Sequence, residues 1–97
     1  MTDERVALIE PIGKQTMTKR VFEVRAEWDE PARVWIATSA DVPGLCCEAA
    51  EFEELVTTVL AIVPELLVAN AVLSPAAARE VPVKVMAERR EIARLVA

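Results

Sequence analysis

Hydrophobic and polar positions alternate in the first segment of the chain that has a clear pattern. The segment Arg20–Trp28 has charged side chains on one face and four apolar ones on the other: Phe22, Val24, Ala26 and Trp28. Side chains of a strand point alternately to opposite faces, so this pattern predicts a half-buried strand. Val34–Thr38 is apolar on both faces and predicts a second strand. The residues between them include Pro31 and predict a turn, so the two strands should form an antiparallel hairpin.

A tight turn and a short strand follow the hairpin. In the turn Asp41-Val42-Pro43-Gly44, proline fixes φ and glycine tolerates a positive φ. Leu45–Ala49 then predicts a third strand, short enough to lie at an edge of the sheet. Its residues Cys46 and Cys47 are adjacent, so one should face the core and the other solvent. A disulfide between adjacent cysteines is strained, so we do not expect one here. We interpret both cysteines as small hydrophobic residues with free thiols, in a protein that stays in a reducing compartment of the cell.

A long amphipathic helix comes next. Its apolar side chains recur at steps of three and four residues: Phe52, Leu55, Val56, Val59, Leu60, Val63, Leu66 and Leu67. Glutamates at the start suit the positive end of the helix dipole. Pro64 lies inside the pattern and predicts a kink or a break; the stripe continues in phase beyond it, which favours a kink. The helix is expected to end at Asn70.

A fourth strand and a terminal helix complete the expected elements. Val81–Met86 alternates in the manner of a strand, and 87–97 has the spacing of a short helix. The order is therefore β-β-β-α-β. A right-handed crossover places the last strand beside the first and parallel to it. The predicted fold class is α+β, a two-layer unit with an antiparallel meander, one long Pro-kinked helix and a returning fourth strand.

Composition limits the classes of protein that fit. The 97 residues suffice for one domain, and 54% of them are hydrophobic, which excludes general disorder. The net charge of -5 makes direct binding of nucleic acid a poor fit unless a local basic patch intervenes, and we expect no membrane partner. No apolar run is long enough to span a membrane or to act as a secretory leader, so we expect a cytoplasmic protein. We divide the chain into a flexible tail (1–18), a domain (19–90) and a short extension (91–97), with Met1 or Met17 as the start.

The sequence contains few residues that could form a catalytic or metal-binding site. The chain has no histidine, and its two adjacent thiols do not supply a tetrahedral metal site. The inward face of the first strand carries no carboxylate that could hold Mg²⁺ for nuclease chemistry. No phosphate-binding glycine loop and no nucleophile–base pair is present. We therefore predict no catalytic residues, no metal and no cofactor.

Several motifs together resemble a known family. They are Trp28-Asp29, Val34–Ser39, Asp41–Leu45, Phe52–Leu55, Pro64–Leu67 and Val81–Arg90. Their order and spacing resemble the HicB-like antitoxin superfamily, and more closely its short stand-alone branch, a bacterial domain of unknown function. The resemblance implies a partial ribonuclease-H-like fold. It also implies a non-catalytic interaction module that masks a small RNA-cleaving toxin and self-associates. The alternative is a domain of this fold without a toxin partner.

Two surfaces are candidate interaction sites. A basic toxin should contact acidic or turn residues that the fold does not itself use, which we expect to lie on one edge: Asp41, Pro43, Gly44, Leu45, Glu51, Glu53 and Glu54. The alternative is that these residues only form a turn and favour the helix dipole. A homodimer should form through apolar side chains off the main stripe of the helix: Ile62, Val68, Val72 and Leu73.

Overall fold

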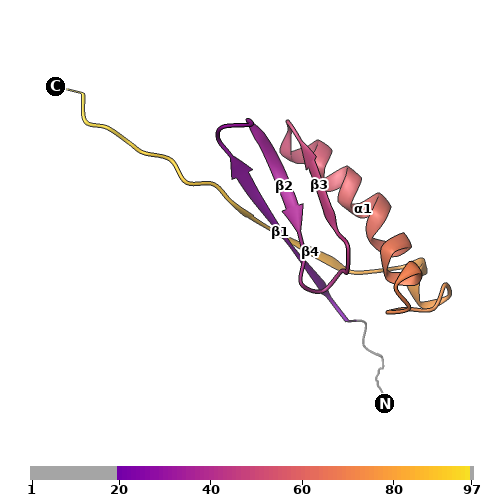
Figure 1. The fold of residues 1–97 in the computed structure, drawn as a ribbon. Coiled ribbons are helices and arrows are strands. Elements are labelled where there is room, and N and C mark those ends of the chain that lie inside the picture. The colour runs from indigo at the N-terminus through magenta and orange to yellow at the C-terminus, as the bar shows by residue number, and fades with distance from the viewer. Residues whose placement is uncertain (1–19, 97) are drawn as a thin grey trace, which may run out of the picture.

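Four strands and one long helix form the regular structure of residues 20–96, the part of the chain that the computed structural model describes (Figure 1). The elements in chain order are β1 (Phe22–Asp29), β2 (Val34–Thr38), β3 (Cys46–Ala49), α1 (Phe52–Ala69), the 3-10 turn η1 (Ala77–Arg79) and β4 (Val83–Glu88). The α+β class and the order β-β-β-α-β are as predicted. The expected tail (1–18) and the alternative start at Met17 lie outside the described residues.

The strands form one mixed sheet in the order β3-β2-β1-β4. β1 pairs antiparallel with β2, and β2 pairs antiparallel with β3, which gives the predicted meander. β4 lies beside β1 and parallel to it, with Val85 opposite Val24. The position and direction predicted for the returning strand are therefore confirmed, and β3 is an edge strand as expected.

Helix α1 covers one face of the sheet and packs mainly on β2 and β3. The core between the two layers is aliphatic apart from one phenylalanine: Phe22, Val24, Ala26, Ala37, Val42, Leu45, Leu55, Val59, Val63 and Leu67. The opposite face of the sheet carries no second layer within residues 20–96 (Figure 1). Charged side chains occupy much of that face, including Arg25 and Glu88, which form an ion pair of 3.5 Å.

The helix runs unbroken through Pro64, which excludes the break that the sequence left open. Its N-terminal residue Glu51 makes no capping hydrogen bond with its side chain. At the other end, the backbone N–H and the side-chain amide of Asn70 both donate to the carbonyl of Leu66. Ala71 follows with φ of 58°, the left-handed conformation that commonly terminates a helix. The predicted end at Asn70 is confirmed.

The C-terminal prediction is wrong in two respects. β4 begins at Val83 rather than at Val81, because Pro82 precedes the strand and only its carbonyl joins the sheet, accepting the N–H of Phe22 at 3.0 Å. The expected terminal helix is also missing from residues 87–96. Ala87 and Glu88 stay extended because they pair with β1, and residues 89–96 then leave the domain as an extended segment (Figure 1). We call residues 89–96 the C-terminal arm.

Candidate partner-binding surface

The turn between β2 and β3 completes the hydrogen bonding of β1. β2 pairs with β1 only as far as Arg25, so both backbone polar groups of Glu23 lack a strand partner on that side. The Asp41 carboxylate accepts the N–H of Glu23 at 2.8 Å, and the Ser39 hydroxyl donates to its carbonyl at 2.5 Å. Ser39 Oγ also accepts the N–H groups of Asp41 and Val42. Asp41 is therefore a structural residue, and the expectation that the fold leaves it unused is wrong.

The remaining turn residues pack on the C-terminal part of α1. Leu45 is only 5% exposed and belongs to the core, so it is not available to a partner. Gly44 has φ of 82°, and a side chain there would meet the Leu66 side chain at 3.8 Å. The Asn70 amide lies 3.4 Å from the carbonyl of Pro43, to which it donates. Of the four predicted turn residues, Pro43 and Gly44 alone are exposed.

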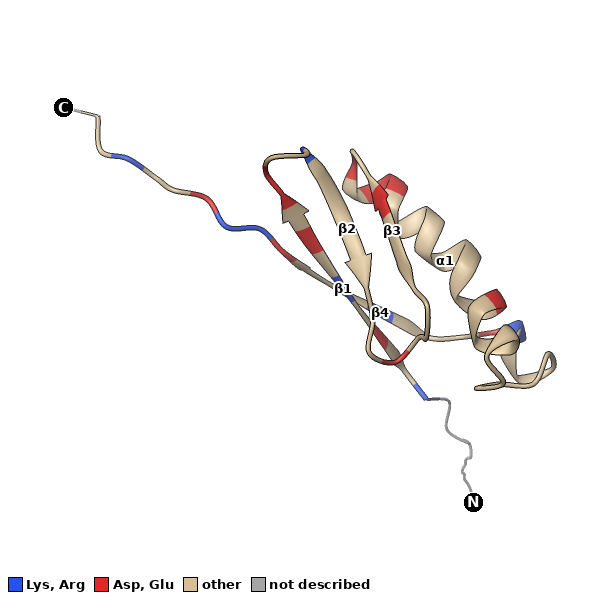
Figure 2. Cartoon of the chain, viewed as in Figure 1, with Lys and Arg blue, Asp and Glu red and all other residues tan. Residues whose placement is uncertain are grey.

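The acidic residues lie at the other end of the same edge. Glu51, Glu53 and Glu54 are exposed at the start of α1, whereas the turn contacts the end of α1. β3 separates the two groups, which lie at opposite ends of this edge. Figure 2 shows acidic residues at both ends of the β3 edge.

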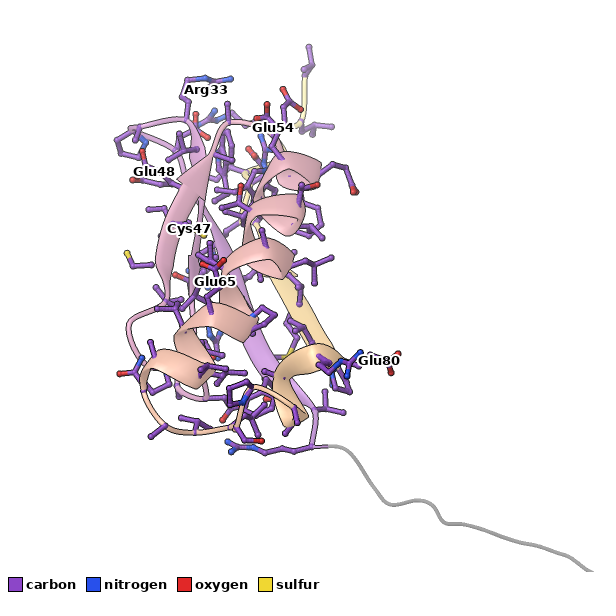
Figure 3. The ribbon with its side chains drawn as sticks, turned by 90° about the vertical axis from the view of Figure 1, so that its right-hand side faces the viewer. Arg33, Cys47, Glu48, Glu54, Glu65 and Glu80 are labelled. Carbon is purple, nitrogen blue, oxygen red and sulfur yellow. The ribbon has the colours of Figure 1, made fainter. Side chains whose placement is uncertain are left out.

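A fourth carboxylate joins the helix-start group. Glu48 of β3 points away from the core and lines a shallow depression of about 600 Å³ together with Ala49, Glu53, Glu54, Thr57 and Thr58. Figure 3 shows Glu48 and Glu54 at the same end of the domain. We call Glu48, Glu51, Glu53 and Glu54 the acidic surface. Sequence reasoning missed Glu48, although its outward position follows from the alternation in β3.

The acidic surface belongs to a stretch of the sequence without basic residues. Residues 34–78 contain no lysine or arginine, and their acidic residues are Asp41, Glu48, Glu51, Glu53, Glu54 and Glu65. Within residues 20–96, the ion pairs of the structure lie elsewhere, on β1, on the β1–β2 turn and around the arm. Figure 2 shows basic residues on the arm, on β1, at the β1–β2 turn, on β4 and in the segment after α1, and Figure 3 places Arg33 of the β1–β2 turn at the same end of the domain as Glu48 and Glu54. Arg33 and Arg89, cations at this end of the domain, are each paired with another glutamate, Glu30 and Glu91, so the acidic surface keeps a negative field toward a partner that approaches β3 and α1.

Aromatic residues join β1, β2 and α1 at this end of the domain. Trp35 lies edge-on to Trp28, with ring centroids 5.6 Å apart, and edge-on to Phe52, at 5.1 Å. The Arg89 guanidinium stacks over Trp28 at 4.3 Å and bonds Glu91 at 2.6 Å. This aromatic cluster therefore fixes the first residue of the arm against the domain.

The residues predicted for self-association are largely used within the domain. Ile62, Val72 and Leu73 are partly buried and pack against the core. Val68 is also half-buried, and it lies beside Pro75 and Ala78 of the segment that follows α1. The large hydrophobic side chains that are exposed lie elsewhere: Val21, Leu60, Ile92, Leu95 and Val96.

The two cysteines differ in environment as the strand pattern predicted. Cys46 is exposed, whereas Cys47 is half-buried and packs against the core; both are free thiols. Burial raises the pKa of the Cys47 thiol, and the neighbouring Cys46 raises it further. Cys47 is therefore the less reactive nucleophile of the two.

Residues 20–96 contain neither a metal-ligand cluster nor a membrane-spanning helix. No three Asp, Glu or Cys side chains there lie close enough together to hold a metal ion. In the same residues, no helix has both the length and the apolar character needed to cross a membrane.

These features define a small α+β domain that presents an acidic surface. Residues 21–97 match the family described as "Domain of unknown function (DUF1902)", and the chain belongs to that family. It is also similar to the hypothetical protein TTHA1013 from the extremely thermophilic bacterium Thermus thermophilus, whose crystal structure aligns with a TM-score of 0.54 at 41% identity, over 78% of this chain and 100% of that one. A comparison with curated proteins finds no match.

Proposed function

We propose that this chain is a non-catalytic protein-interaction module whose partner is a small basic protein. The observation that carries the proposal is the acidic surface, formed by Glu48, Glu51, Glu53 and Glu54 in a stretch of 45 residues (34–78) without lysine or arginine. Complementary charge of this kind raises the association rate and disfavours wrong partners. The surface lies on rigid elements, an edge strand and the first turn of α1, so little ordering is needed on binding.

The specific form of the proposal is an antitoxin-type domain of the HicB-like, partial ribonuclease-H-like fold. The order β-β-β-α-β with β4 parallel to β1 supports this relation. In this role the module masks a basic, RNA-cleaving toxin in the cytoplasm and acts as a homodimer. A domain of the same fold without a toxin partner is the second candidate, favoured by the structural use of Asp41 and Leu45, which reduces the surface left for a toxin.

The experiment begins with a candidate partner, a small basic protein with a single histidine encoded next to this chain. Its binding is measured by stopped-flow association at several salt concentrations. The test variant is Glu53→Lys/Glu54→Lys, and the control is Glu27→Lys/Glu65→Lys, which changes the net charge equally on exposed positions elsewhere. Both variants should change the free energy of unfolding by less than about 1 kcal/mol.

We expect the test variant to associate at least about tenfold more slowly and with a weaker dependence on salt than the control. Equal rates for the two variants would show that the acidic surface is not the contact site. Absence of binding to any co-encoded basic protein would favour the second candidate. Cleavage of RNA or DNA by the purified chain with Mg²⁺, abolished by EDTA, would contradict the non-catalytic role altogether.

A further inference from the structure

The C-terminal arm exposes more apolar surface than any other part of residues 20–96. The exposed fractions of its large hydrophobic residues are 74% for Ile92, 97% for Leu95 and 90% for Val96. The other large hydrophobic side chains of the described residues are about half exposed or less. An extended segment with three such residues is a typical docking element, because burying them removes unfavourable contact with water.

The arm does not reach the core of its own domain. β4 runs parallel to β1, and the arm continues beyond Glu88 in the direction that leads away from α1 (Figure 1). Its first residue is held in place, since Arg89 stacks over Trp28 and bonds Glu91. The arm is therefore directed outwards, and its apolar residues are exposed to solvent.

The same domain has an apolar surface that its own layers cover only in part. α1 packs mainly on β2 and β3, and on the flank of the helix toward β4 the side chain of Val56 is half-buried and that of Leu60 exposed. The side chains at three- and four-residue spacing on this flank are Glu53, Val56 and Leu60, and Leu60 is 52% exposed. On the sheet below, Val83 and Val85 of β4 are half-buried and pack against the core. We call Glu53, Val56 and Leu60 the helix flank.

The charges of the arm and of the helix flank are complementary. The arm contains three basic residues, Arg89, Arg90 and Arg94, and one acid, Glu91, beside its apolar side chains. The helix flank carries an acid at its N-terminal end and belongs to the stretch 34–78, which has no basic residue. The helix flank of a second copy of this chain therefore offers the arm an apolar surface for its hydrophobic residues and a negative charge for its arginines.

We propose that two copies of this chain exchange their C-terminal arms, each arm lying on the helix flank of the other copy. Each chain has both an arm and a helix flank. A single two-fold axis therefore relates the two arm–flank contacts, and the assembly is a closed dimer. The interface differs from the one expected at Ile62, Val68, Val72 and Leu73, which face the segment after α1 or the core. The proposal does not depend on a toxin partner, since it concerns only this chain.

The first test measures molar mass by light scattering and sedimentation over a range of concentrations. The full chain is compared with a chain that ends at Arg90 and with Val21→Ser, a control that removes an exposed apolar side chain at the opposite end of β1. We expect the full chain and Val21→Ser to be dimers. Loss of the arm should weaken dimerisation by at least about a hundredfold, because each contact loses three apolar side chains. Equal self-association of the full and the shortened chain would refute the exchange.

The second test locates the acceptor. In a background with Cys46→Ser and Cys47→Ser, one chain carries Leu95→Cys and a second carries Leu60→Cys, and the two are mixed under mild oxidation. We expect a disulfide-linked heterodimer, whereas Val21→Cys in place of Leu60→Cys should give little product. Equal cross-linking at both positions would exclude the helix flank. If the shortened chain keeps its mass but loses binding to a single-stranded RNA that the full chain binds, the arm is a nucleic-acid element and the proposal is wrong.

Discussion

Replacing Asp41 by alanine should destabilise the domain, although Asp41 lies in an accessible turn. Its carboxylate accepts the N–H of Glu23 at a point where β2 no longer pairs with β1, and it lies 3.4 Å from the Arg20 guanidinium. A hydrogen bond to a charged group contributes about 1.5–3 kcal/mol. The Asp41 side chain is 31% exposed, so water replaces part of this bond in the variant. The exposed pair with Arg20 contributes little.

We therefore expect Asp41→Ala to lower the free energy of unfolding by about 1–2 kcal/mol, with a fall in Tm of roughly 5–15 °C for a domain of this size. Asp41→Asn keeps an acceptor oxygen and should lose less than Asp41→Ala. Ser39→Ala removes the donor to the Glu23 carbonyl and should also destabilise. Because the two residues share one network, the double variant should depart from additivity.

Urea denaturation of these variants and of the unchanged chain measures the differences, with the slope m unchanged if only the native contacts are lost. The reasoning would be refuted if Asp41→Ala unfolded within about 0.5 kcal/mol of the unchanged chain. If the same variant also weakened the complex with a basic partner, Asp41 would be a binding residue, as the sequence pattern predicts.

Two further predictions concern α1 and β3. Pro64→Ala should stabilise the domain by about 1–3 kcal/mol in urea denaturation, because proline inside a helix removes a backbone donor and crowds the preceding turn; an unchanged or lower stability would show that the helix depends on the proline ring. Iodoacetamide should alkylate Cys46 before Cys47, and labelling of Cys47 should rise only at higher pH because its pKa is raised, which peptide mass spectrometry can follow; equal rates at every pH would contradict the burial assigned to Cys47.

Local patterns were sufficient to predict most of the elements. In both Arg20–Trp28 and the helix that begins at Phe52, one face of the element is buried. Burial of one face produces a regular spacing of apolar residues, which can be seen in a short segment of the sequence. Local patterns did not show where β4 begins, because Val81 is in phase with Val83 and Val85. The prediction for the arm failed for a related reason. Ile92, Leu95 and Val96 have helical spacing, but a short helix needs a surface to pack on, and these three side chains make no such contact with residues 20–88, since all are exposed.

The candidate site was less predictable because it depends on contacts between distant segments. The role of Asp41 follows from where β2 stops pairing with β1, which no local pattern contains. The separation of the turn from Glu53 and Glu54 was foreseeable, since a strand of four residues is about 13 Å long. The outward position of Glu48 was equally accessible, because alternation in β3 turns Cys47 and Ala49 toward the core and Glu48 away from it.

The aromatic cluster has a consequence for spectroscopy. The chain has two tryptophans and no tyrosine, and both indoles belong to the contact that joins β1, β2 and α1 beside Arg89. Intrinsic fluorescence of residues 20–96 therefore reports on one end of the domain, whereas far-ultraviolet circular dichroism is dominated by α1. Coincident unfolding curves from the two signals would show that the sheet end and the helix melt as one cooperative unit. A change in tryptophan emission without a change in circular dichroism would show that Arg89 and the aromatic cluster move while the domain stays folded.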